Sequence, residues 1–444
     1  MSTILFANPC WWGNDNGKLL RGIRAGSRWP FFFASAFRPD NFQFGQYTPY
    51  PIFLGHAAAW AERAMDGEHT VVMRDSVGRG ESYVSFFTYL RDLRPDVLIV
   101  ETGAAAWEHD RGLLALIKQH FTEIRIAVAG PTARSAYKQD EAHAHETSTP
   151  SPIDAFLLGE YEKNSVDFIN GATGLLPFNT LTREEMNRQP FPMFDEGCWD
   201  HYWDACPVGA RYPELQVWAS RGCNAVCNFC SFPATMTNDD PLGLGGRKIR
   251  FYDTAWLEPM IRERMAKAQD AGKPLASVRF DGDTENAWNK HTLAICEMMK
   301  RIGLPWSMMC RADTSTREVW QAMKDSGCFG VKIGFESGSD RIVNEVVKKK
   351  LNIQEAAETA KFLRSIGLSV HGTFMIGHPT ETAEERQMTH DFITKLYADN
   401  ALNSHQLSGC AELDGTPLAN STIADPSYVR DRDGVHKVQE LMKK

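Results

Sequence analysis

Short apolar segments alternate with amphipathic segments along both halves of the 444-residue chain, and this alternation limits the fold more than any other feature. In the second half, one strand and one helix recur at intervals of about 30 residues, the length of a strand–helix repeat. Strands that are connected through helices pair in parallel, and parallel sheets need helices to cover them. The sequence therefore predicts an α/β protein with two parallel sheets.

The first half is predicted to form a Rossmann-like, doubly wound parallel sheet. Its strands are expected at residues 3–7, 70–74, 97–100, 124–129 and 155–158. Amphipathic helices between these strands would cover both faces of the sheet. Ligands of such sheets bind beyond the carboxyl ends of the strands, so the loops that follow the strands are the candidate binding loops.

The second half is predicted to form six strand–helix units that curve into a partial, TIM-like (β/α)6 barrel. Its strands are expected at residues 215–219, 277–281, 307–311, 330–335, 369–376 and 405–408. In barrels of this type the chemistry takes place at the carboxyl ends of the strands. The predicted domain limits are 1–163 for the first sheet, 164–213 for an interdomain linker, 214–418 for the barrel and 419–444 for a short C-terminal tail.

Three cysteines follow the first predicted barrel strand, at Cys223, Cys227 and Cys230. The spacing C-x3-C-x2-C offers three thiolates to a [4Fe–4S] cluster and leaves its fourth iron open to bind and reduce a small molecule. A zinc site is one alternative, but zinc requires a fourth ligand, and no cysteine or histidine stands nearby in the sequence. Three ordinary thiols are the other alternative.

The composition predicts an ordinary globular protein of the reducing cytoplasm. The chain is 43% apolar and 23% charged, and 48 basic against 56 acidic residues give a net charge of −8. This balance offers no electrostatic footprint for nucleic acid or for an anionic membrane. Ten cysteines in so long a chain, three of them clustered, argue against a disulfide framework. The first residues do not match a secretory leader, and the aromatic stretch Trp29–Phe37 is too short to span a bilayer.

From about residue 210 to residue 418, the sequence resembles the radical S-adenosylmethionine (SAM) enzymes, specifically those with an N-terminal cobalamin-binding domain. Beyond the cysteines, the resemblance rests on stretches in the order typical of the family, namely VRFDGDT at 278–284, RAD at 311–313, GCFGVKIGFESG at 327–338, GTFMIGHPTET at 372–382 and DGTP at 414–417. The first half matches more loosely, for example through FLLGE at 156–160.

The resemblance implies that the three cysteines hold the cluster and that its open iron binds SAM. The residues it implies for SAM binding are Phe229, Asp281, Gly282, Asp283, Arg311, Glu336, Ser337, Met375 and Gly377. In this scheme the 281–283 segment binds the SAM amino group, Arg311 the carboxylate and the 336–337 pair the ribose, while residues 375–377 border the adenine. The alternatives are that Arg311 pairs with Asp313 and that Asp281 and Asp283 cap a helix.

The resemblance also implies cobalamin in the first domain. Many cobalamin proteins carry Asp-x-His-x-x-Gly after the first strand, whereas this chain has NPCWWG at 8–13, so no protein histidine is expected below the cobalt. The residues expected near cobalamin are Asn8, Cys10, Trp11, Gly13, Asp75, Val77, Glu101, Thr102, Gly103, Gly130, Gly159 and Glu160. For Cys10, the two roles considered are a cobalt ligand and a buried structural thiol.

The function implied is that of a cobalamin-dependent radical SAM methyltransferase. Such an enzyme generates a 5′-deoxyadenosyl radical at the cluster and transfers a methyl group through methylcobalamin to an unactivated centre of a small substrate. One alternative keeps both cofactors but performs cyclisation, ring rearrangement or oxidation without methyl transfer. An alternative of another class is a non-catalytic iron–sulfur protein for sensing or electron transfer.

The expected partners are a small-molecule substrate, an external reductant such as flavodoxin or ferredoxin, and a partner subunit that completes an open active site. Neither nucleic acid nor a membrane is expected. His371 and His405 stand in predicted barrel strands and are the candidate acid–base groups. For each of them, a hydrogen-bonded histidine of the core is the alternative.

Overall fold

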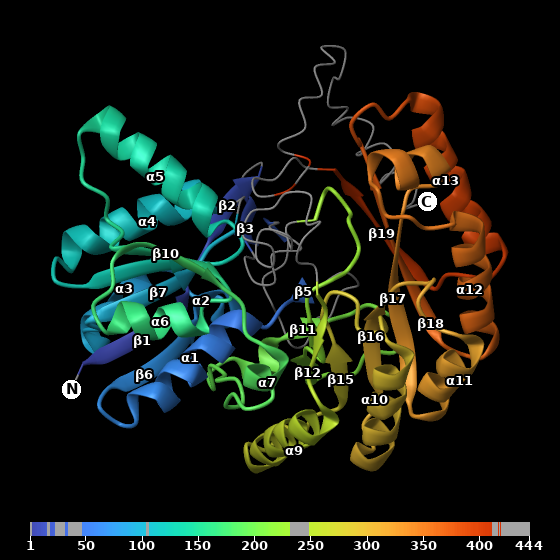
Figure 1. Cartoon of the computed structure of the whole chain (residues 1–444), viewed down its shortest axis with the longest axis horizontal. Coiled ribbons are helices and arrows are strands. Elements are labelled where there is room, and N and C mark those ends of the chain that lie inside the picture. Colours follow the sequence, from blue (N-terminus) through green and yellow to red (C-terminus); the bar gives the residue numbers. More distant parts are fainter. Residues whose placement is uncertain are drawn as a thin grey trace. The chain divides into compact units, whose positions relative to one another are not determined.

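The computed structural model describes residues 2–15, 18–22, 32–33, 47–103, 106–230 and 248–410, together with 416 and 418. The chain divides into two compact units between Trp203 and Asp204, and Cys230 and Thr416 group with the first unit (Figure 1). The predicted tail 419–444, most of the stretch Trp29–Phe37, and residues 414, 415 and 417 of the DGTP motif lie outside the described residues.

The first unit contains a six-stranded parallel sheet. Its strands, in spatial order, are β10 (Gly174–Asn179), β9 (Ala155–Gly159), β8 (Arg125–Ala129), β7 (Val97–Glu101), β1 (Thr3–Asn8) and β6 (Thr70–Asp75). The chain leaves β1 to form β6 on one side and then returns to form β7 on the other. The strand order therefore reverses beside β1, and the crevice at such a reversal is where doubly wound sheets bind ligands.

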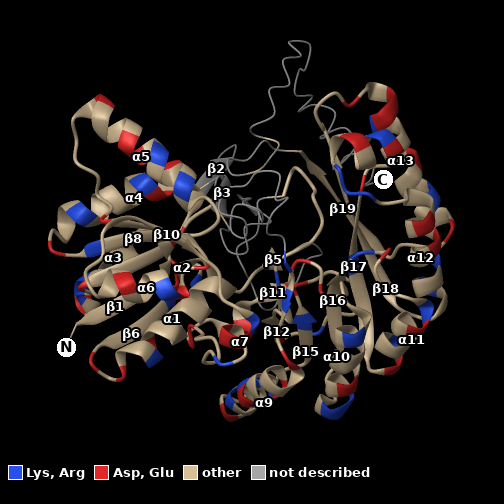
Figure 2. Cartoon of the chain, in the orientation of Figure 1, with Lys and Arg blue, Asp and Glu red and all other residues tan. Residues whose placement is uncertain are grey.

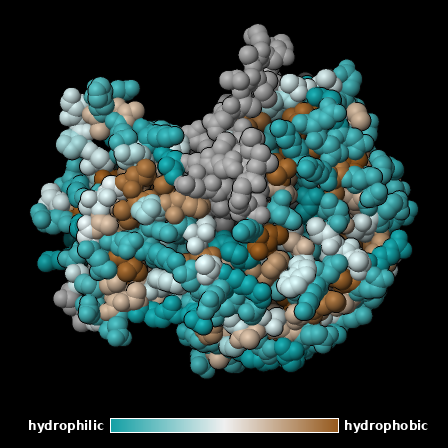
Figure 3. All heavy atoms as spheres, viewed as in Figure 1, coloured by the Kyte–Doolittle hydropathy of each residue, from teal (hydrophilic) through white to brown (hydrophobic). Residues whose placement is uncertain are grey.

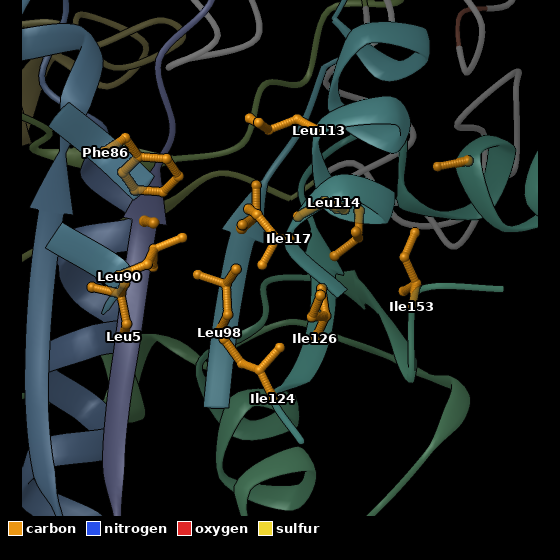
Figure 4. Close-up of a cluster of buried hydrophobic side chains, with 14 of the residues drawn as sticks. Leu5, Phe86, Leu90, Leu98, Leu113, Leu114, Ile117, Ile124, Ile126 and Ile153 are labelled. Carbon is orange, nitrogen blue, oxygen red and sulfur yellow. The ribbon is translucent and has the colours of Figure 1, made fainter. Parts of the chain in front are cut away.

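Helices cover both faces of this sheet. The helices are α1 (Ile52–Met65), α2 (Ser76–Arg79), α3 (Tyr83–Leu93), α4 (Trp107–His120), α5 (Ala133–Thr147), α6 (Glu162–Ile169) and α7 (Arg183–Met186). Helices α3, α4 and α5 share a hydrophobic core with the sheet, in which Phe86, Leu114 and Ile117 pack on Leu98 and Ile126 (Figure 4). Helices α1 and α6 contact one another (Figure 1). The unit is therefore doubly wound, as predicted.

Residues 164–203 differ from the predicted linker. They group with the first unit and supply its edge strand β10 as well as α7. Gly174 and Pro177 interrupt the apolar pattern of β10, and its pairing with β9 shifts register between Leu176 and Asn179. A proline is tolerated there because an edge strand leaves one row of N–H groups unpaired. The strand was therefore not recognisable from periodicity.

Smaller strands accompany the first sheet. Strands β2 (Trp12–Asp15), β3 (Lys18–Gly22) and β4 (Phe32–Phe33) form an antiparallel sheet, and β5 (Tyr47–Thr48) pairs with β11 (Trp203–Asp204). A 3-10 helix spans Trp199–His201.

The second unit contains six parallel strands whose spatial order follows the chain. They are β12 (Glu214–Val217), β15 (Ser277–Phe280), β16 (Trp306–Cys310), β17 (Cys328–Glu336), β18 (Ser369–Ile376) and β19 (Ser404–Gly409). The helices lie along one side of this sheet (Figure 1) and are α9 (Thr254–Asp270), α10 (Asn289–Ile302), α11 (Arg317–Asp325), α12 (Ile353–Ser365) and α13 (Ala383–Ala398). A short π-helix spans Ile342–Val346, and β13 (Ser220–Arg221) pairs with β14 (Arg250–Phe251). The order of the strands is that of the predicted partial barrel.

The outer surfaces of both units are of mixed character. Figure 2 shows basic and acidic residues interspersed along α5, α9 and α12. On the face drawn in Figure 3, apolar patches alternate with hydrophilic ones. Within the described part of the chain, no helix combines the length and the apolar character needed to cross a bilayer.

Candidate active site at the carboxyl ends of the barrel strands

The cysteine loop follows β13. Gly222 begins it with φ +92°, and a Cβ at this position would stand 2.6 Å from the carbonyl oxygen of Lys248, so only glycine fits. Cys223 and Cys230 are partly exposed, Cys227 is buried, and none of the three forms a disulfide. The Sγ of Cys223 accepts a hydrogen bond from the N–H of Ala225 at 3.4 Å and lies 3.3 Å from Thr284 Oγ1.

The chemistry of these thiols fits an iron–sulfur cluster with an open iron, because three thiolates in one short loop can each bind a different iron of a cubic cluster. An N–H donor to a ligand sulfur, as at Cys223, is also a feature that tunes such clusters.

Glu285 holds the start of the cysteine loop against the loop after β15. Its carboxyl accepts hydrogen bonds from Ala219 N at 2.8 Å, from Ser220 Oγ at 2.7 Å and from Gly282 N at 2.9 Å. Glu285 is fully buried, and this burial raises the pKa of its carboxyl to about 7. A protonated carboxyl can keep all three contacts, because one oxygen accepts both amides while the other donates to the serine.

The variant Glu285→Gln is expected to change how stability depends on pH. Between pH 4.5 and about pH 7, the unfolded chain has released the Glu285 proton that the folded chain still retains. The free energy of unfolding therefore falls as the pH rises through this range. The amide keeps the contacts without titrating, and the variant should exceed the wild type at pH 8 by up to about 3 kcal/mol. Urea titrations at pH 5 and pH 8 measure this. The exposed Glu297→Gln is the control, and an equal difference at both pH values would contradict the prediction.

The acids predicted to bind the SAM amino group lie together at the end of β15, but each already has a protein partner. Asp281 Oδ1 accepts from Arg279 Nε at 3.1 Å. Asp283 Oδ2 accepts from Gly222 N at 3.2 Å, which ties it to the cysteine loop. Their place fits the prediction, whereas the role in ligand binding stays a prediction.

Arg311 follows β16 and forms a two-pronged ion pair with Asp313, with Nε–Oδ1 at 2.9 Å and Nη2–Oδ2 at 2.7 Å. This is the pairing considered as its alternative role. The same Nη2 also donates to the carbonyl oxygen of Lys349 at 3.2 Å. A role toward the SAM carboxylate would require Arg311 to share or exchange these partners.

Glu336 ends β17 in a left-handed backbone conformation, with φ +68°. It is 7% exposed, and its Oε1 accepts from Lys349 Nζ at 2.6 Å. Non-glycine residues adopt this conformation at a cost, and such strained residues are enriched at functional sites. The neighbouring Ser337 is fully buried and contacts Thr389 Oγ1 at 2.9 Å, so in this structure it anchors α13.

The end of β18 offers two buried atoms without hydrogen-bond partners among the described residues, His378 Nε2 and Glu381 Oε1. The other oxygen of Glu381 accepts from the N–H groups of Gly377 and His378. Burial lowers the pKa of His378 to about 4 and raises the pKa of Glu381 to about 7. Unpartnered buried polar atoms are costly, and a polar ligand beside Met375 and Gly377 would satisfy them.

His371 lies deep in the barrel. It is 3% exposed, its Nδ1 lies 2.9 Å from Ser404 Oγ, and burial lowers its pKa to about 3. His405 contacts Tyr397 OH through Nδ1 at 2.8 Å, and burial also lowers its pKa. The geometry of His371 resembles the core role considered for it, whereas His405 is only half-buried, and its role stays a prediction.

In the first unit, the ends of β1 and β6 are tied together. Asn8 Nδ2 donates to Asp75 Oδ1 at 2.9 Å, and Gly78 N donates to the same oxygen at 2.8 Å. Burial raises the pKa of Asp75 to about 6, and Val77 is buried beside it. Cys10 is 1% exposed within the hydrophobic core, the environment of a structural thiol rather than a cobalt ligand.

A chain of hydrogen bonds, which no sequence pattern indicated, links the loops after β1 and β7. Trp12 N donates to Tyr83 OH at 3.1 Å, and this hydroxyl contacts His109 Nε2 at 2.7 Å. His109 Nδ1 contacts Asp110 Oδ1 at 3.0 Å, and Thr102 Oγ1 donates to Asp110 Oδ2 at 2.7 Å. Trp11, 3% exposed, lies beside His109. These contacts fix the loops at the strand reversal.

The predicted cobalamin-loop glycines serve close packing within the protein. A Cβ on Gly130, whose φ is +110°, would stand 2.6 Å from the Thr102 carbonyl oxygen. A Cβ on Gly159 would stand 2.2 Å from the Asn179 carbonyl oxygen. Gly13 lies in β2, and Gly103 follows Thr102.

The two acids predicted for the same loops are buried. Glu101 accepts from Tyr161 OH at 2.6 Å, and burial raises its pKa to about 7. Glu160 accepts from Leu181 N at 2.6 Å. Both side chains therefore hold parts of the first unit together, and their contact with a ligand stays a prediction.

Two buried donors at this edge have no hydrogen-bond partner in the described part of the chain, Trp107 Nε1 and Thr132 Oγ1. Thr132 lies between β8 and α5, and Trp107 is the first residue of α4, which follows β7. Both therefore lie where the chain leaves the carboxyl end of a strand. A ligand with amide or phosphate oxygens would satisfy them, so this edge fits a cofactor such as cobalamin.

The model of the radical SAM superfamily matches residues 219–393, which contain the cysteine loop and the ends of β15 to β18. Residues 219–393 therefore form a region of the radical SAM superfamily. The superfamily implies a [4Fe–4S] cluster and SAM, and the cysteine loop fits the cluster. The predicted resemblance is thereby confirmed.

Curated relatives extend beyond the radical SAM region. The uncharacterized methyltransferase PH0819 of Pyrococcus horikoshii is 28% identical over 407 residues, which cover 85% of this chain and 79% of that protein. Cytidylyl-2-hydroxyethylphosphonate methyltransferase of Streptomyces wedmorensis is 28% identical over 225 residues, but these cover 47% of this chain and only 39% of that enzyme.

A solved structure shares the fold of this chain over most of the length of the chain. The radical SAM methyltransferase TsrM from Kitasatospora setae, solved with cobalamin and a [4Fe–4S] cluster, matches with a TM-score of 0.59 at 12% identity. The match covers 82% of this chain and 73% of TsrM. The predicted fold class, a Rossmann-like sheet followed by a partial barrel, is confirmed by this likeness and by the two sheets.

Besides Glu285, His378 and Glu381, sequence reasoning missed two groups of residues in the second unit. Lys349 pairs with Glu336, but it is the middle of three consecutive lysines, and nothing in the sequence marks it out. Asp204 contacts Lys332 and Arg279 inside the barrel. Asp204 stands in the predicted linker, and Arg279 and Lys332 lie in predicted strands, so no local pattern connects the three.

Proposed function

We propose that this protein is a cobalamin-dependent radical SAM methyltransferase acting on a small molecule. The observation that carries the proposal is the three-cysteine loop held by Glu285 and Asp283 at the carboxyl ends of the barrel strands. A second parallel sheet, whose strand order reverses beside β1, supports a second cofactor site. The names of both relatives and of TsrM support methyl transfer.

In this proposal, Cys223, Cys227 and Cys230 hold the cluster, which supplies an electron to SAM at its open iron. Glu336 would accept hydrogen bonds from a sugar, and His378 Nε2 would contact a purine. The buried ends of β15 to β18 would exclude water, which a radical reaction requires. An external reductant of the flavodoxin or ferredoxin type, and a partner subunit that completes the site, belong to the same proposal.

For cobalamin, the chain offers the loops after β1, β7 and β8, and we expect no histidine of the chain to act as a cobalt ligand. Trp107 Nε1 and Thr132 Oγ1 would donate hydrogen bonds to it. Cobalamin would supply a methyl group that its cobalt carries. The network from Trp12 to Thr102 would keep the loops in place.

The variant Thr132→Val is expected to weaken cobalamin binding without lowering stability. Among the residues that the structure describes, the buried hydroxyl Thr132 Oγ1 has no partner, so its removal from the free protein costs no hydrogen bond there. If it donates to bound cobalamin, the loss should weaken hydroxocobalamin binding roughly tenfold, the cost of one hydrogen bond. Binding is followed by visible absorption and stability by thermal melting. Unchanged affinity would contradict the predicted contact.

Anaerobic reconstitution with iron, sulfide and hydroxocobalamin, followed by incubation with reductant and methyl-labelled SAM, tests the function. We expect about four irons and one cobalt per chain, 5′-deoxyadenosine, S-adenosylhomocysteine and label on bound cobalamin. 5′-Deoxyadenosine without label on cobalt would favour the non-methylating radical chemistry. A bound cluster without either product would favour an iron–sulfur sensor or electron carrier.

A further inference from the structure

Three consecutive lysines follow the π-helix of the second unit, and only the middle one is buried. Lys348 and Lys350 are exposed, whereas Lys349 is 8% exposed. A lysine is rarely buried unless a partner compensates its charge. Lys349 therefore requires buried partners for its ammonium, whereas its two exposed neighbours do not.

The Lys349 ammonium has two partners at the end of β17. Nζ donates to Glu336 Oε1 at 2.6 Å and to the carbonyl oxygen of Gly334 at 2.6 Å. A Cβ on Gly334 would stand 2.6 Å from this same nitrogen, so the missing side chain makes room for the ammonium. The cation is thus held rigidly at the carboxyl end of the strand.

The backbone around this ion pair is strained. Lys348 and Lys350 have φ values of +58° and +55°, and Glu336 has +68°. Left-handed conformations of this kind cost about 1 kcal/mol or more each, and they persist only where the surroundings impose them. The two strained residues flank Lys349 and turn its side chain inward, while their own side chains stay in solvent.

The turn that carries Lys349 is bound directly to the cysteine loop. Asn228, the residue after Cys227, donates from its N–H to Val347 O at 3.1 Å and from Nδ2 to Val346 O at 2.5 Å. The positive charge therefore lies close to Cys227. In agreement, the charge of Lys349 acts electrostatically on the Cys227 thiol, and so does the charge of Arg311.

We propose that Lys349 raises the reduction potential of the cluster bound by Cys223, Cys227 and Cys230. Reduction adds one negative charge to the cluster, and a fixed cation in a water-poor site stabilises the reduced form more than the oxidised form. Glu336 partly offsets this effect. The inference rests on the proposed cluster, but it depends neither on cobalamin nor on methyl transfer.

The test is the midpoint potential of the reconstituted cluster, measured without SAM by redox titration with electron paramagnetic resonance. Lys349→Met should lower the potential by about 59 mV or more, which corresponds to a tenfold change in a one-electron equilibrium. Lys349→Arg should restore most of it. Lys348→Met and Lys350→Met remove the same charge from exposed neighbours and are the matched controls, which should stay close to the wild type.

Glu336→Gln is an independent test, because it should shift the midpoint potential in the opposite direction. Removal of the carboxylate leaves the ammonium uncompensated, so the potential should rise above that of the wild type. Equal potentials for the wild type, Lys349→Met and Glu336→Gln, at full iron content, would overturn the inference and leave the proposed function intact. A wild-type chain that binds no cluster would overturn both. If Lys349→Met does not assemble a cluster, an unchanged or lowered potential in Glu336→Gln is sufficient to overturn the inference.

Discussion

Replacement of Cys223 by serine is expected to abolish cluster binding and SAM cleavage. Iron requires the soft thiolate, and a serine hydroxyl at neutral pH does not replace it. We expect iron to fall from about four atoms per chain to a small fraction of this, and 5′-deoxyadenosine to fall to the background level. Iron analysis and product chromatography on the reconstituted variant provide the measurement.

Cys410→Ser is the matched control for this variant. Like Cys223, Cys410 is a partly exposed cysteine outside any disulfide, but it follows β19 and lies outside the three-cysteine motif. Its substitution should leave the iron content unchanged. Retention of the full iron content by Cys223→Ser, or an equal loss in both variants, would show that the cluster is not held as proposed.

Replacement of Asp204 by alanine is expected to destabilise the second unit by roughly 3–5 kcal/mol, because it leaves buried cations unpaired. Asp204 is 3% exposed and contacts Lys332 Nζ, while its Oδ2 lies 3.3 Å from Arg279 Nη2. Arg279 is completely buried, and its other contacts include the carbonyl oxygen of Cys206 at 2.8 Å. Urea denaturation, with the exposed Asp270→Ala as control, measures the loss.

Asp204 also makes the stability of the second unit depend on pH. Burial alone would raise the pKa of this carboxyl, but Arg279 and Lys332 lower it below its ordinary value of 3.8. The ion pair therefore contributes its full stability above that value, and the contribution is lost as the pH falls through the lowered pKa. Asp204→Asn should show less acid destabilisation than the wild type.

A stability of Asp204→Ala within about 0.5 kcal/mol of the wild type, as for a surface substitution, would contradict the buried ion pair.

Much of the fold could be predicted, because burial on both faces makes each parallel strand a short apolar run. The strand expected at 369–376 is β18 (Ser369–Ile376), and that expected at 3–7 is β1 (Thr3–Asn8). The edge strand β10 could not be predicted, because glycine and proline interrupt its pattern and only pairing with β9 makes it a strand. The predicted linker, for the same reason, belongs largely to the first unit.

The sequence by itself determined the features that depend on local spacing. The spacing of Cys223, Cys227 and Cys230 is sufficient to indicate a cluster with an open iron, because one short loop supplies all the protein ligands. The alternation of apolar strands with helices is likewise sufficient for the two parallel sheets, because each helix follows the strand that it covers. Such features need no knowledge of distant residues.

Only the tertiary structure decided which polar residues meet. Lys349 is distinguished from Lys348 and Lys350 by a strained turn that buries one of three identical side chains. Asp204 meets Lys332 across 128 positions of the chain, and Glu285 meets Ala219 across 66. A charge is stable in the interior only beside a partner, and the partner is brought there by the packing of the strands and not by the sequence around it.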